Sequence, residues 1–227
     1  MKIALIGSGK TGQYITQLVA HEKLVGPFNR SNPPTSSQLA QADVIIIFIP
    51  GTSVLDILEE VLVAGKPAVW ASTGAPWPND LHHRLVKNKV TWVAASNFSL
   101  AMPLIHQAIT QLSQAPQFLD NPKFHIHEIH HTAKKDGPSG TALLWKEWLQ
   151  QPATLSFSRK DDVKGIHTLT IKTTTEEITL KHEAFDRSIF ARGALWTAQQ
   201  LFNGNFKEPG FHSFINVVEH HFKRNDS

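Results

Sequence analysis

The densest group of reactive side chains in the sequence lies between Glu128 and Thr141. Within it, the adjacent histidines His130 and His131 can donate protons near neutral pH. Lys134 follows His130 by four residues and supplies a fixed positive charge. An imidazole acid beside a lysine suits a reaction in which an anionic small molecule is protonated.

The end of the same segment offers groups that bind a carboxylate. Ser139, Gly140 and Thr141 stand at the expected start of a helix, where hydroxyl groups and free N–H groups favour an anion. Together with the histidines, they suit a dianionic acid that is protonated as it is reduced. The alternative is a solvated loop without function. Asp136 and Pro138 are expected to shape the loop rather than to take part in the chemistry.

A metal site is the other alternative for this region. His125, His127, His130 and His131 could bind zinc, which accepts histidine and carboxylate ligands when cysteine is absent. Along a strand, however, His125 and His127 share one face and His130 lies on the other. A three-ligand site from this run alone is awkward, and we expect no metal.

A glycine turn near the N-terminus predicts a second kind of binding site. Gly7, Gly9 and Gly12 follow the apolar run Ile3–Ile6, and apolar residues then recur at helical spacing from Tyr14. Strand, glycine turn and helix in this order are typical of dinucleotide binding, because glycines let the backbone turn tightly and let a pyrophosphate approach. The alternative is a merely structural turn.

The residues after the expected second strand bear on the choice of dinucleotide. The usual acidic residue that binds the ribose 2′-hydroxyl is missing from Phe28-Asn29-Arg30-Ser31. Arg30 could instead pair with a 2′-phosphate, and Lys10 adds positive charge to the glycine turn. We therefore expect NADPH to bind at least as well as NADH, unless Arg30 is only a solvated loop charge.

Apolar patterning predicts the elements that hold these residues. Short buried strands alternate with helices as far as about residue 95, which predicts a parallel sheet with right-handed crossovers. The strands are expected at residues 3–6, 24–28, 44–49, 67–71 and 90–95, with helices at 14–19, 39–42, 54–62 and 81–86. Ser36 or Ser37 is expected to cap the second of these helices.

The pattern changes after Asn97. Helices are expected at residues 102–112, 139–149, 187–202 and 211–222, and strands at 124–129, 154–159, 165–174 and 177–182. Alternating apolar and polar residues in these strands predict an open sheet with one wet face. The fold class is thus α/β, with a Rossmann-type parallel sheet domain and a second α+β domain that carries an open mixed sheet.

Composition sets outer bounds on function. The chain has 227 residues, 41% of them hydrophobic and 18% charged, and no cysteine, which excludes disulfides, a thiolate nucleophile and Cys-ligated metal. Its 22 basic and 19 acidic residues give a net charge of +3, too little to predict nucleic-acid binding. No apolar run approaches the roughly 18 residues that span a bilayer. We expect a cytoplasmic protein with neither a nucleic-acid nor a membrane partner.

The segment Glu128–Ala142 resembles the signature of the 4-hydroxy-tetrahydrodipicolinate reductase (dihydrodipicolinate reductase) family of lysine and diaminopimelate biosynthesis. That signature reads Glu, one residue, His-His, two residues, Lys, one residue, Asp, a small residue, then Pro-Ser-Gly-Thr-Ala. The resemblance extends over essentially the whole chain, through Ala95–Ser99, Ser72–Gly74, Gly165–His167 and the late stretch His182–Ala194.

The resemblance implies an NAD(P)H-dependent oxidoreductase that reduces a dicarboxylate, with hydride transfer to C4 and His130 as general acid. Residues 1–101 and 187–227 would form the dinucleotide-binding domain, and residues 102–186 the substrate-binding domain, whose open sheet would build a homotetramer. Domain closure would bring the Lys134 loop to the nicotinamide.

The implied site residues fall into three groups. The catalytic residues would be His130 and Lys134. The substrate-binding residues would be His131, Ser139, Gly140 and Thr141. The cofactor, NADPH or NADH, would lie against Gly7, Ser8, Gly9, Lys10, Thr11, Gly12, Asn29, Arg30, Ala71, Ser72, Thr73, Gly74, Ala95, Ser96, Asn97 and Phe98.

The sequence departs from the family pattern at Phe48–Pro50, Ala71–Ser72, Ala101 and Thr132–Ala133. Two other readings stay open. One is a different two-domain nicotinamide enzyme that reduces another imine or an amino acid, and the other is a non-catalytic NADPH sensor.

Overall fold

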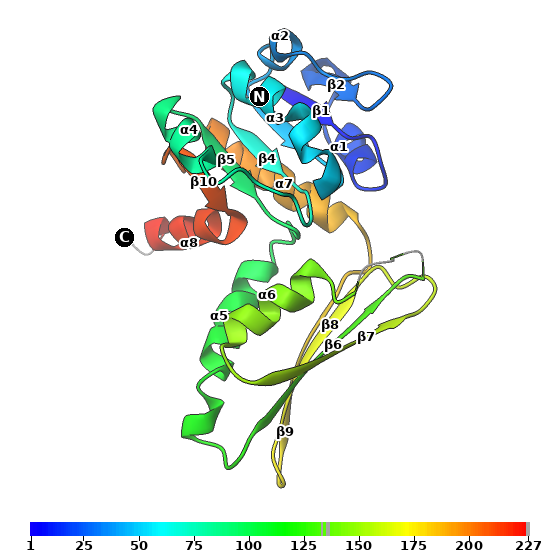
Figure 1. Cartoon of the computed structure of the whole chain (residues 1–227), viewed down its shortest axis with the longest axis vertical. Helices are drawn as coiled ribbons and strands as arrows, with labels where there is room; N and C mark the ends of the chain where they lie inside the picture. Colours follow the sequence, from blue (N-terminus) through cyan, green and yellow to red (C-terminus); the bar gives the residue numbers. More distant parts are fainter. Residues whose placement is uncertain (133, 135–136, 226–227) are drawn as a thin grey trace. The chain divides into compact units, whose positions relative to one another are not determined.

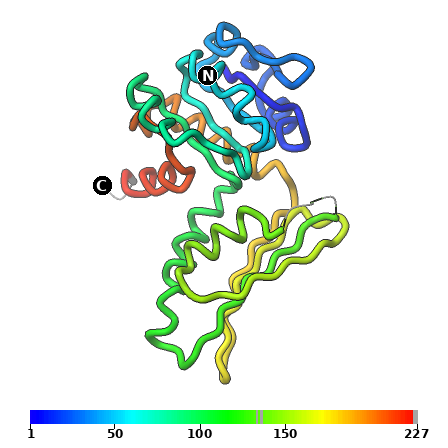
Figure 2. Tube along the Cα trace, in the orientation of Figure 1, coloured from blue at the N-terminus to red at the C-terminus, as the bar shows by residue number. Residues whose placement is uncertain are grey.

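The chain forms two compact units in the computed structural model, which describes residues 1–132, 134 and 137–225 (Figure 1). The first unit is Met1–Leu100 with Ser188–Ser227, and the second is Ala101–Arg187. The trace leaves the first unit once and returns to it once (Figure 2). The departure at Ala133 and the loop-shaping role expected of Asp136 fall outside the described residues.

A six-stranded sheet forms the centre of the first unit. All its neighbouring strands pair in parallel, in the order β10-β5-β4-β3-β1-β2. The strands are β1 (Ile3–Ile6), β2 (Leu24–Phe28), β3 (Val44–Ile47), β4 (Ala68–Trp70), β5 (Thr91–Ala94) and β10 (Gly210–Ser213).

Apolar runs explain why this sheet is buried on both sides. Every residue of β1, β3 and β4 is buried, as expected for strands between two helical layers. The core on one face includes residues of α2 (Ser36–Leu39), α3 (Val54–Ala64) and α4 (Leu81–Lys87). The core on the other face includes residues of α1 (Gly12–Leu18), α7 (Ser188–Phe202) and α8 (Phe214–Asn225). The predicted Rossmann-type parallel sheet is confirmed.

The last strand was not expected. The stretch 211–222 was predicted as one helix, but β10 occupies its start and pairs in parallel with β5, and α8 begins only at Phe214. Gly210 has a φ of 133° and donates its N–H to the Val90 carbonyl at 2.9 Å, which starts the pairing. The helical prediction was wrong there because four residues are too few to show a strand's periodicity, whereas the open edge of β5 accepts a partner.

The predicted cap of α2 was also wrong. Thr35, rather than Ser36 or Ser37, is the N-cap, and its hydroxyl accepts from the Gln38 N–H while the Gln38 side chain accepts from the Thr35 N–H. This reciprocal capping box favours the residue three positions before a glutamine.

The second unit places two long helices on a four-stranded mixed sheet. The strands are β6 (Lys123–His130), β7 (Ala153–Arg159), β8 (Ile166–Lys172) and β9 (Glu177–Glu183), in the order β7-β6-β8-β9. Strand β6 pairs in parallel with β7 and antiparallel with β8, which pairs antiparallel with β9. The helices are α5 (Met102–Leu112) and α6 (Gly140–Leu149).

Strict alternation gives this sheet two different faces. Phe124, Ile126, Leu169 and Ile171 are buried in one core together with residues of α5 and α6. On the opposite face, His125 and His127 contact the hydroxyl groups of β7. The predicted open mixed sheet is therefore confirmed. Among the described residues, no helix combines the length and the apolarity needed to cross a bilayer.

Candidate active site

The predicted cofactor residues follow the carboxyl ends of four parallel strands in the first unit. The glycine turn follows β1, Asn29 and Arg30 follow β2, and the segments 71–74 and 95–98 follow β4 and β5. Ligands of open α/β sheets bind at this edge. The sheet thus brings to one edge segments that lie far apart in the chain, from Gly7 to Phe98.

The three glycines of the turn have three different environments. Gly7 has a φ of 96°, and a Cβ added there would lie 2.1 Å from the Phe48 carbonyl oxygen. A Cβ added at Gly12 would lie 1.8 Å from the Gly7 carbonyl oxygen. A Cβ added at Gly9 would meet nothing within 4 Å. The outer two glycines therefore allow close packing, and the middle one leaves open space in which a pyrophosphate can approach the backbone.

Arg30 is presented by a tight turn after β2. The Asn29 side chain shapes this turn by accepting from the N–H groups of Ser31 and Asn32, at 2.9 and 3.0 Å. The Arg30 guanidinium then donates to the hydroxyl of Ser53 at 3.0 Å, just before α3 begins. The cation is held beside a hydroxyl, an arrangement that can bind a phosphate group.

Unpaired hydroxyls lie after β4 and β5. Among the described residues, the buried Oγ atoms of Ser72 and Ser96 have no hydrogen-bond partner. Because a buried hydroxyl without a partner is costly, these two atoms mark a place for a polar ligand. Phe98 differs from the other predicted cofactor residues, since its side chain is in the core and packs on Phe214 with ring centroids 4.9 Å apart.

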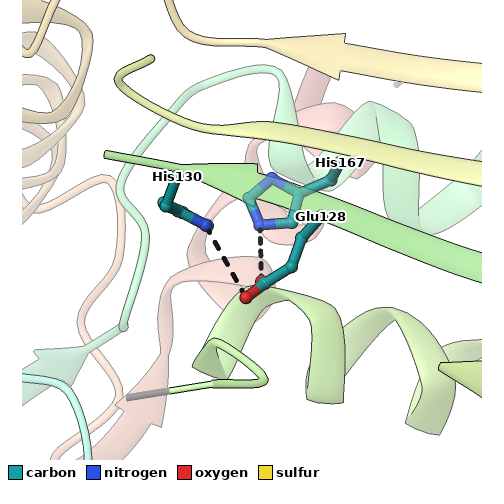
Figure 3. Close-up of side chains that lie close together, drawn as sticks. All are labelled: Glu128, His130 and His167. Carbon is teal, nitrogen blue, oxygen red and sulfur yellow. Dashed lines mark ion pairs between the residues drawn. The ribbon is translucent and has the colours of Figure 1, made fainter. Parts of the chain in front are cut away.

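In the second unit, a buried carboxylate lies beside the proposed acid. Glu128 and His130 are on the same face of β6, and Glu128 is fully buried. The His130 Nδ1 atom lies 3.7 Å from Glu128 Oε1, and the Nε2 atom of His167, on β8, lies 3.6 Å from Oε2 (Figure 3). The strand order β6-β8 thus brings both imidazoles to one carboxylate.

The start of α6 joins the same cluster. Ser139 caps the helix by accepting from the Ala142 N–H at 3.2 Å, and its own N–H donates to Glu128 Oε1 at 3.0 Å. Its hydroxyl is also 3.2 Å from His167 Nε2. Of the predicted carboxylate-binding residues, Ser139 therefore contacts Glu128 directly. Gly140 is the first residue of α6, and Thr141 is buried in its first turn.

Arg159 connects the predicted residue Lys134 to this cluster. Arg159, at the end of β7, has its Nη1 atom 3.7 Å from Glu128 Oε1, and its Nε donates to the Lys134 carbonyl at 3.0 Å. The Lys134 N–H donates in turn to the His131 carbonyl at 3.0 Å. His130, His131, Lys134 and Ser139 are thus linked through Glu128 and Arg159.

The pKa values of Glu128, His167 and His182 are all shifted from their ordinary values. Burial alone would raise the pKa of the Glu128 carboxyl, but its polar contacts with His130, His167 and Ser139 outweigh that effect and hold the pKa far below its usual range. Burial lowers the pKa of His167. It also lowers the pKa of His182, and the repulsion that would arise if His182 and His167 were both protonated lowers it further. At neutral pH an ionised Glu128 therefore lies beside a neutral His167.

These shifts predict acid sensitivity in two stages. His167 and His182 bind protons less readily in the folded chain, so stability should fall as pH drops below their ordinary value of 6.5. Glu128 stabilises the fold above its ordinary value of 4.5, and this contribution should be lost below that pH. Thermal melts of the wild type and Glu128→Gln should therefore converge as pH falls below 4.5. Parallel melting curves would contradict this assignment, and Glu177→Gln, at an exposed position on β9, serves as the control.

Metal ligation is the competing use of these side chains. Glu128, His130 and His167 offer ligand atoms that all lie within 4.8 Å of one another. This set was not predicted, because His167 comes from β8 rather than from the histidine-rich run on β6. The carboxylate, however, already accepts from Ser139 and faces the Arg159 guanidinium. We therefore interpret the cluster as an ion-pair network, and the expectation of no metal stays a prediction.

Comparison with known proteins places the chain in a family. A model of the dihydrodipicolinate reductase C-terminus matches residues 102–218. The 4-hydroxy-tetrahydrodipicolinate reductase of Pelagibacter ubique is 30% identical over 210 residues, covering 81% of this chain and 79% of that protein. The chain belongs to the dihydrodipicolinate reductase family. The reductase of Bdellovibrio bacteriovorus is 29% identical over 228 residues, 96% of each chain.

A solved structure of the family has the same fold. The dipicolinate-bound dihydrodipicolinate reductase of Paenisporosarcina sp. TG-14 superposes with a TM-score of 0.69 and 16% identity, covering 96% of this chain and 99% of that one. The family predicted from the Glu128–Ala142 signature is therefore confirmed.

Sequence reasoning gave no role to Glu128, His167 or Arg159. One signal for Glu128 is present in the sequence: its position in β6 shares a face with Phe124 and Ile126, where alternation predicts an apolar residue. A charged residue at a core position indicates a buried polar network. No comparable signal points to Arg159, whose contact depends on the pairing of β7 with β6.

Proposed function

We propose that this chain catalyses the NAD(P)H-dependent reduction of 4-hydroxy-tetrahydrodipicolinate to 2,3,4,5-tetrahydrodipicolinate in lysine and diaminopimelate biosynthesis. The observation that carries the proposal is the cluster of the buried Glu128 and Ser139 with the half-buried His130, in a chain of this family. It joins an imidazole acid to a helix start that can bind a carboxylate. Met1–Leu100 with Ser188–Ser227 would bind the dinucleotide, and Ala101–Arg187 would bind the substrate.

The first unit fits a nicotinamide dinucleotide. Its glycine turn leaves space at Gly9, and the hydroxyls of Ser72 and Ser96 have no partner among the described residues. When bound, the reduced dinucleotide supplies the hydride. The glycine turn would hold the pyrophosphate, and the two serines would offer hydrogen bonds at the ends of β4 and β5.

The second unit supplies the proton and the groups that bind the substrate. Loss of water from the hydroxy substrate gives a conjugated cyclic imine, and addition of hydride at C4 of that ring leaves an enamine. His130 donates a proton to the enamine carbon, so that one hydride and one proton together saturate one carbon–carbon double bond. Lys134 stabilises the negative charge, and the ring carboxylates bind to His131, Ser139, Gly140 and Thr141.

A coupled assay tests this function. The product of aspartate-semialdehyde and pyruvate condensation is supplied with NADPH, and absorbance of the reduced nicotinamide is followed. We expect NADPH oxidation that depends on the condensation product. Oxidation with other cyclic imines but none with this product would contradict the proposal, as would dinucleotide binding with no turnover.

Arg30 should set the preference between the two dinucleotides. We propose that its guanidinium, beside the Ser53 hydroxyl, binds the 2′-phosphate of NADPH. Hydrogen bonds to charged groups contribute about 1.5–3 kcal/mol, so Arg30→Ala should weaken NADPH binding roughly 10- to 150-fold and leave NADH binding nearly unchanged. Calorimetric dissociation constants for both dinucleotides decide this. An equal loss of affinity for both dinucleotides would show that Arg30 does not bind the 2′-phosphate.

Assembly and location complete the proposal. We propose a cytoplasmic homotetramer built on the open sheet of the second unit, as the family resemblance implies. The chain mass is 25.3 kDa, so sedimentation equilibrium should give about four times that value. A monomer at assay concentration would contradict the proposed tetramer but would leave the proposed reaction untested by this result.

A further inference from the structure

The buried carboxylate of Glu128 is surrounded by polar groups from several elements. Its side chain is fully buried on β6, yet one oxygen, Oε1, accepts from the Ser139 N–H at 3.0 Å and lies 3.7 Å from both His130 Nδ1 and Arg159 Nη1. The other oxygen, Oε2, lies 3.6 Å from His167 Nε2 and has no hydrogen-bond partner among the described residues. One carboxylate thus faces groups from β6, β7, β8 and the start of α6.

The position of the carboxylate distinguishes the two nitrogens of His130. The Nδ1 atom is the one that faces Glu128 (Figure 3). The Nε2 atom is on the side of Gly165, where an added Cβ would lie 3.2 Å from it. An ionised carboxylate only accepts hydrogen bonds, so it favours a proton on Nδ1. Nε2 is then the nitrogen that can deliver a proton, and glycine at position 165 keeps side-chain atoms away from it.

The same carboxylate fixes the proposed substrate subsite. Because Oε1 accepts the Ser139 N–H, it anchors the residue that caps α6. Ser139, Gly140 and Thr141 are the residues proposed to bind the ring carboxylates. Movement of Glu128 would therefore disturb both the acid and the subsite, although Glu128 itself need not touch the substrate.

We propose that Glu128 is a positioning residue that orients His130 for proton transfer through its charge and aligns the start of α6 through its hydrogen bond to Ser139. The inference rests on the proposed function and assigns a task to a residue that the reaction scheme does not use. The charged and titratable groups around this pair come from three strands. Glu128 faces His130 on β6, Arg159 on β7 faces Glu128, and the His167 ring on β8 packs against the His130 ring. The charge of Lys134 also acts on His167.

Two substitutions separate the two tasks. Glu128→Gln keeps an oxygen that can accept the Ser139 N–H but removes the charge, and its amide N–H groups donate toward Nδ1. We expect kcat to fall about 10- to 100-fold with little change in KM, as for other groups that orient an imidazole.

Glu128→Asp should give the opposite pattern. It keeps the charge on a shorter side chain, and a hydrogen bond weakens more steeply with distance than a charge interaction does. We expect KM for the dicarboxylate to rise about tenfold or more with the loss of the Ser139 contact, and kcat to recover relative to Glu128→Gln. Glu177→Gln makes the same chemical change at an exposed position on β9 and should leave both constants unchanged.

Two measurements remain informative if a variant folds poorly or if the proposed substrate is not turned over. Nitrogen-15 NMR of the wild-type histidines should show that neutral His130 carries its proton on Nδ1. Calorimetry with pyridine-2,6-dicarboxylate should show weaker binding to Glu128→Asp than to Glu128→Gln. Failure of turnover in the wild type would remove the proposed function alone.

Three results would overturn the inference. The first is a neutral wild-type His130 protonated on Nε2. The second is a kcat for Glu128→Gln within twofold of the wild type. The third is loss of wild-type activity on chelation with EDTA, since the carboxylate would then be a metal ligand.

Discussion

Replacement of His130 with glutamine is expected to lower kcat by about 100- to 10,000-fold, the usual contribution of a general acid. Glutamine is similar in reach and can still form hydrogen bonds, but it cannot deliver a proton at neutral pH. The proton on the enamine carbon would then have to come from water. Steady-state rates with the condensation product and saturating NADPH measure the effect.

The controls for this variant are dinucleotide affinity and a second histidine. Dissociation constants for NADPH should not change, because the predicted dinucleotide residues belong to the first unit and His130 belongs to the second. His125→Gln makes the same change on β6 but on the opposite face, where the ring contacts Thr154 and Ser156, and it should keep its activity. Equal rates for His130→Gln and the wild type would remove His130 from the mechanism.

Alanine at two glycines of the turn should separate stability from cofactor binding. At Gly12 a Cβ would lie 1.8 Å from the Gly7 carbonyl, so the turn must shift, and we expect a loss of about 1–3 kcal/mol in the free energy of unfolding. At Gly9 a Cβ meets no protein atom within 4 Å, so stability should change by less than about 1 kcal/mol. The added methyl would instead occupy the space proposed for the pyrophosphate.

We therefore expect Gly9→Ala to raise the dissociation constant of NADPH about tenfold or more while its denaturation midpoint stays near that of the wild type. Urea denaturation and calorimetry, performed on both variants, measure the two effects. Each variant is the control for the other. Wild-type NADPH affinity in Gly9→Ala would contradict a dinucleotide at this turn.

The sequence predicts most of the first unit because burial leaves a local trace. Strands β1 and β3 are continuous apolar runs, and the glycine turn follows β1 directly, so each element can be recognised from its own residues. Strand β10 has no such trace: Gly210 is buried, but the three residues after it are half-buried or exposed, and the strand forms by pairing with β5. Long-range pairing of this kind is not visible in a short window of sequence.

Some residues of the candidate site can likewise be predicted from a short segment, and others cannot. His130, Lys134 and Ser139 could be named from one segment, because they lie within ten positions of one another and carry complementary chemistry. His167 and Arg159 reach the same carboxylate only through the pairing of β8 and β7 with β6. The predicted segment thus contains the proposed reacting groups together with Glu128, whereas Arg159 and His167 come from neighbouring strands.

A labelled hydride shows directly whether the chain transfers hydride to C4 of the substrate ring. NADPH that carries deuterium at both hydrogen positions of the nicotinamide C4 is incubated with the chain and the condensation product, and the product is analysed by NMR and mass spectrometry. We expect 2,3,4,5-tetrahydrodipicolinate with a single deuterium at C4. Deuterium at the imine carbon, or a wild-type chain that leaves labelled NADPH unoxidised, would contradict this expectation.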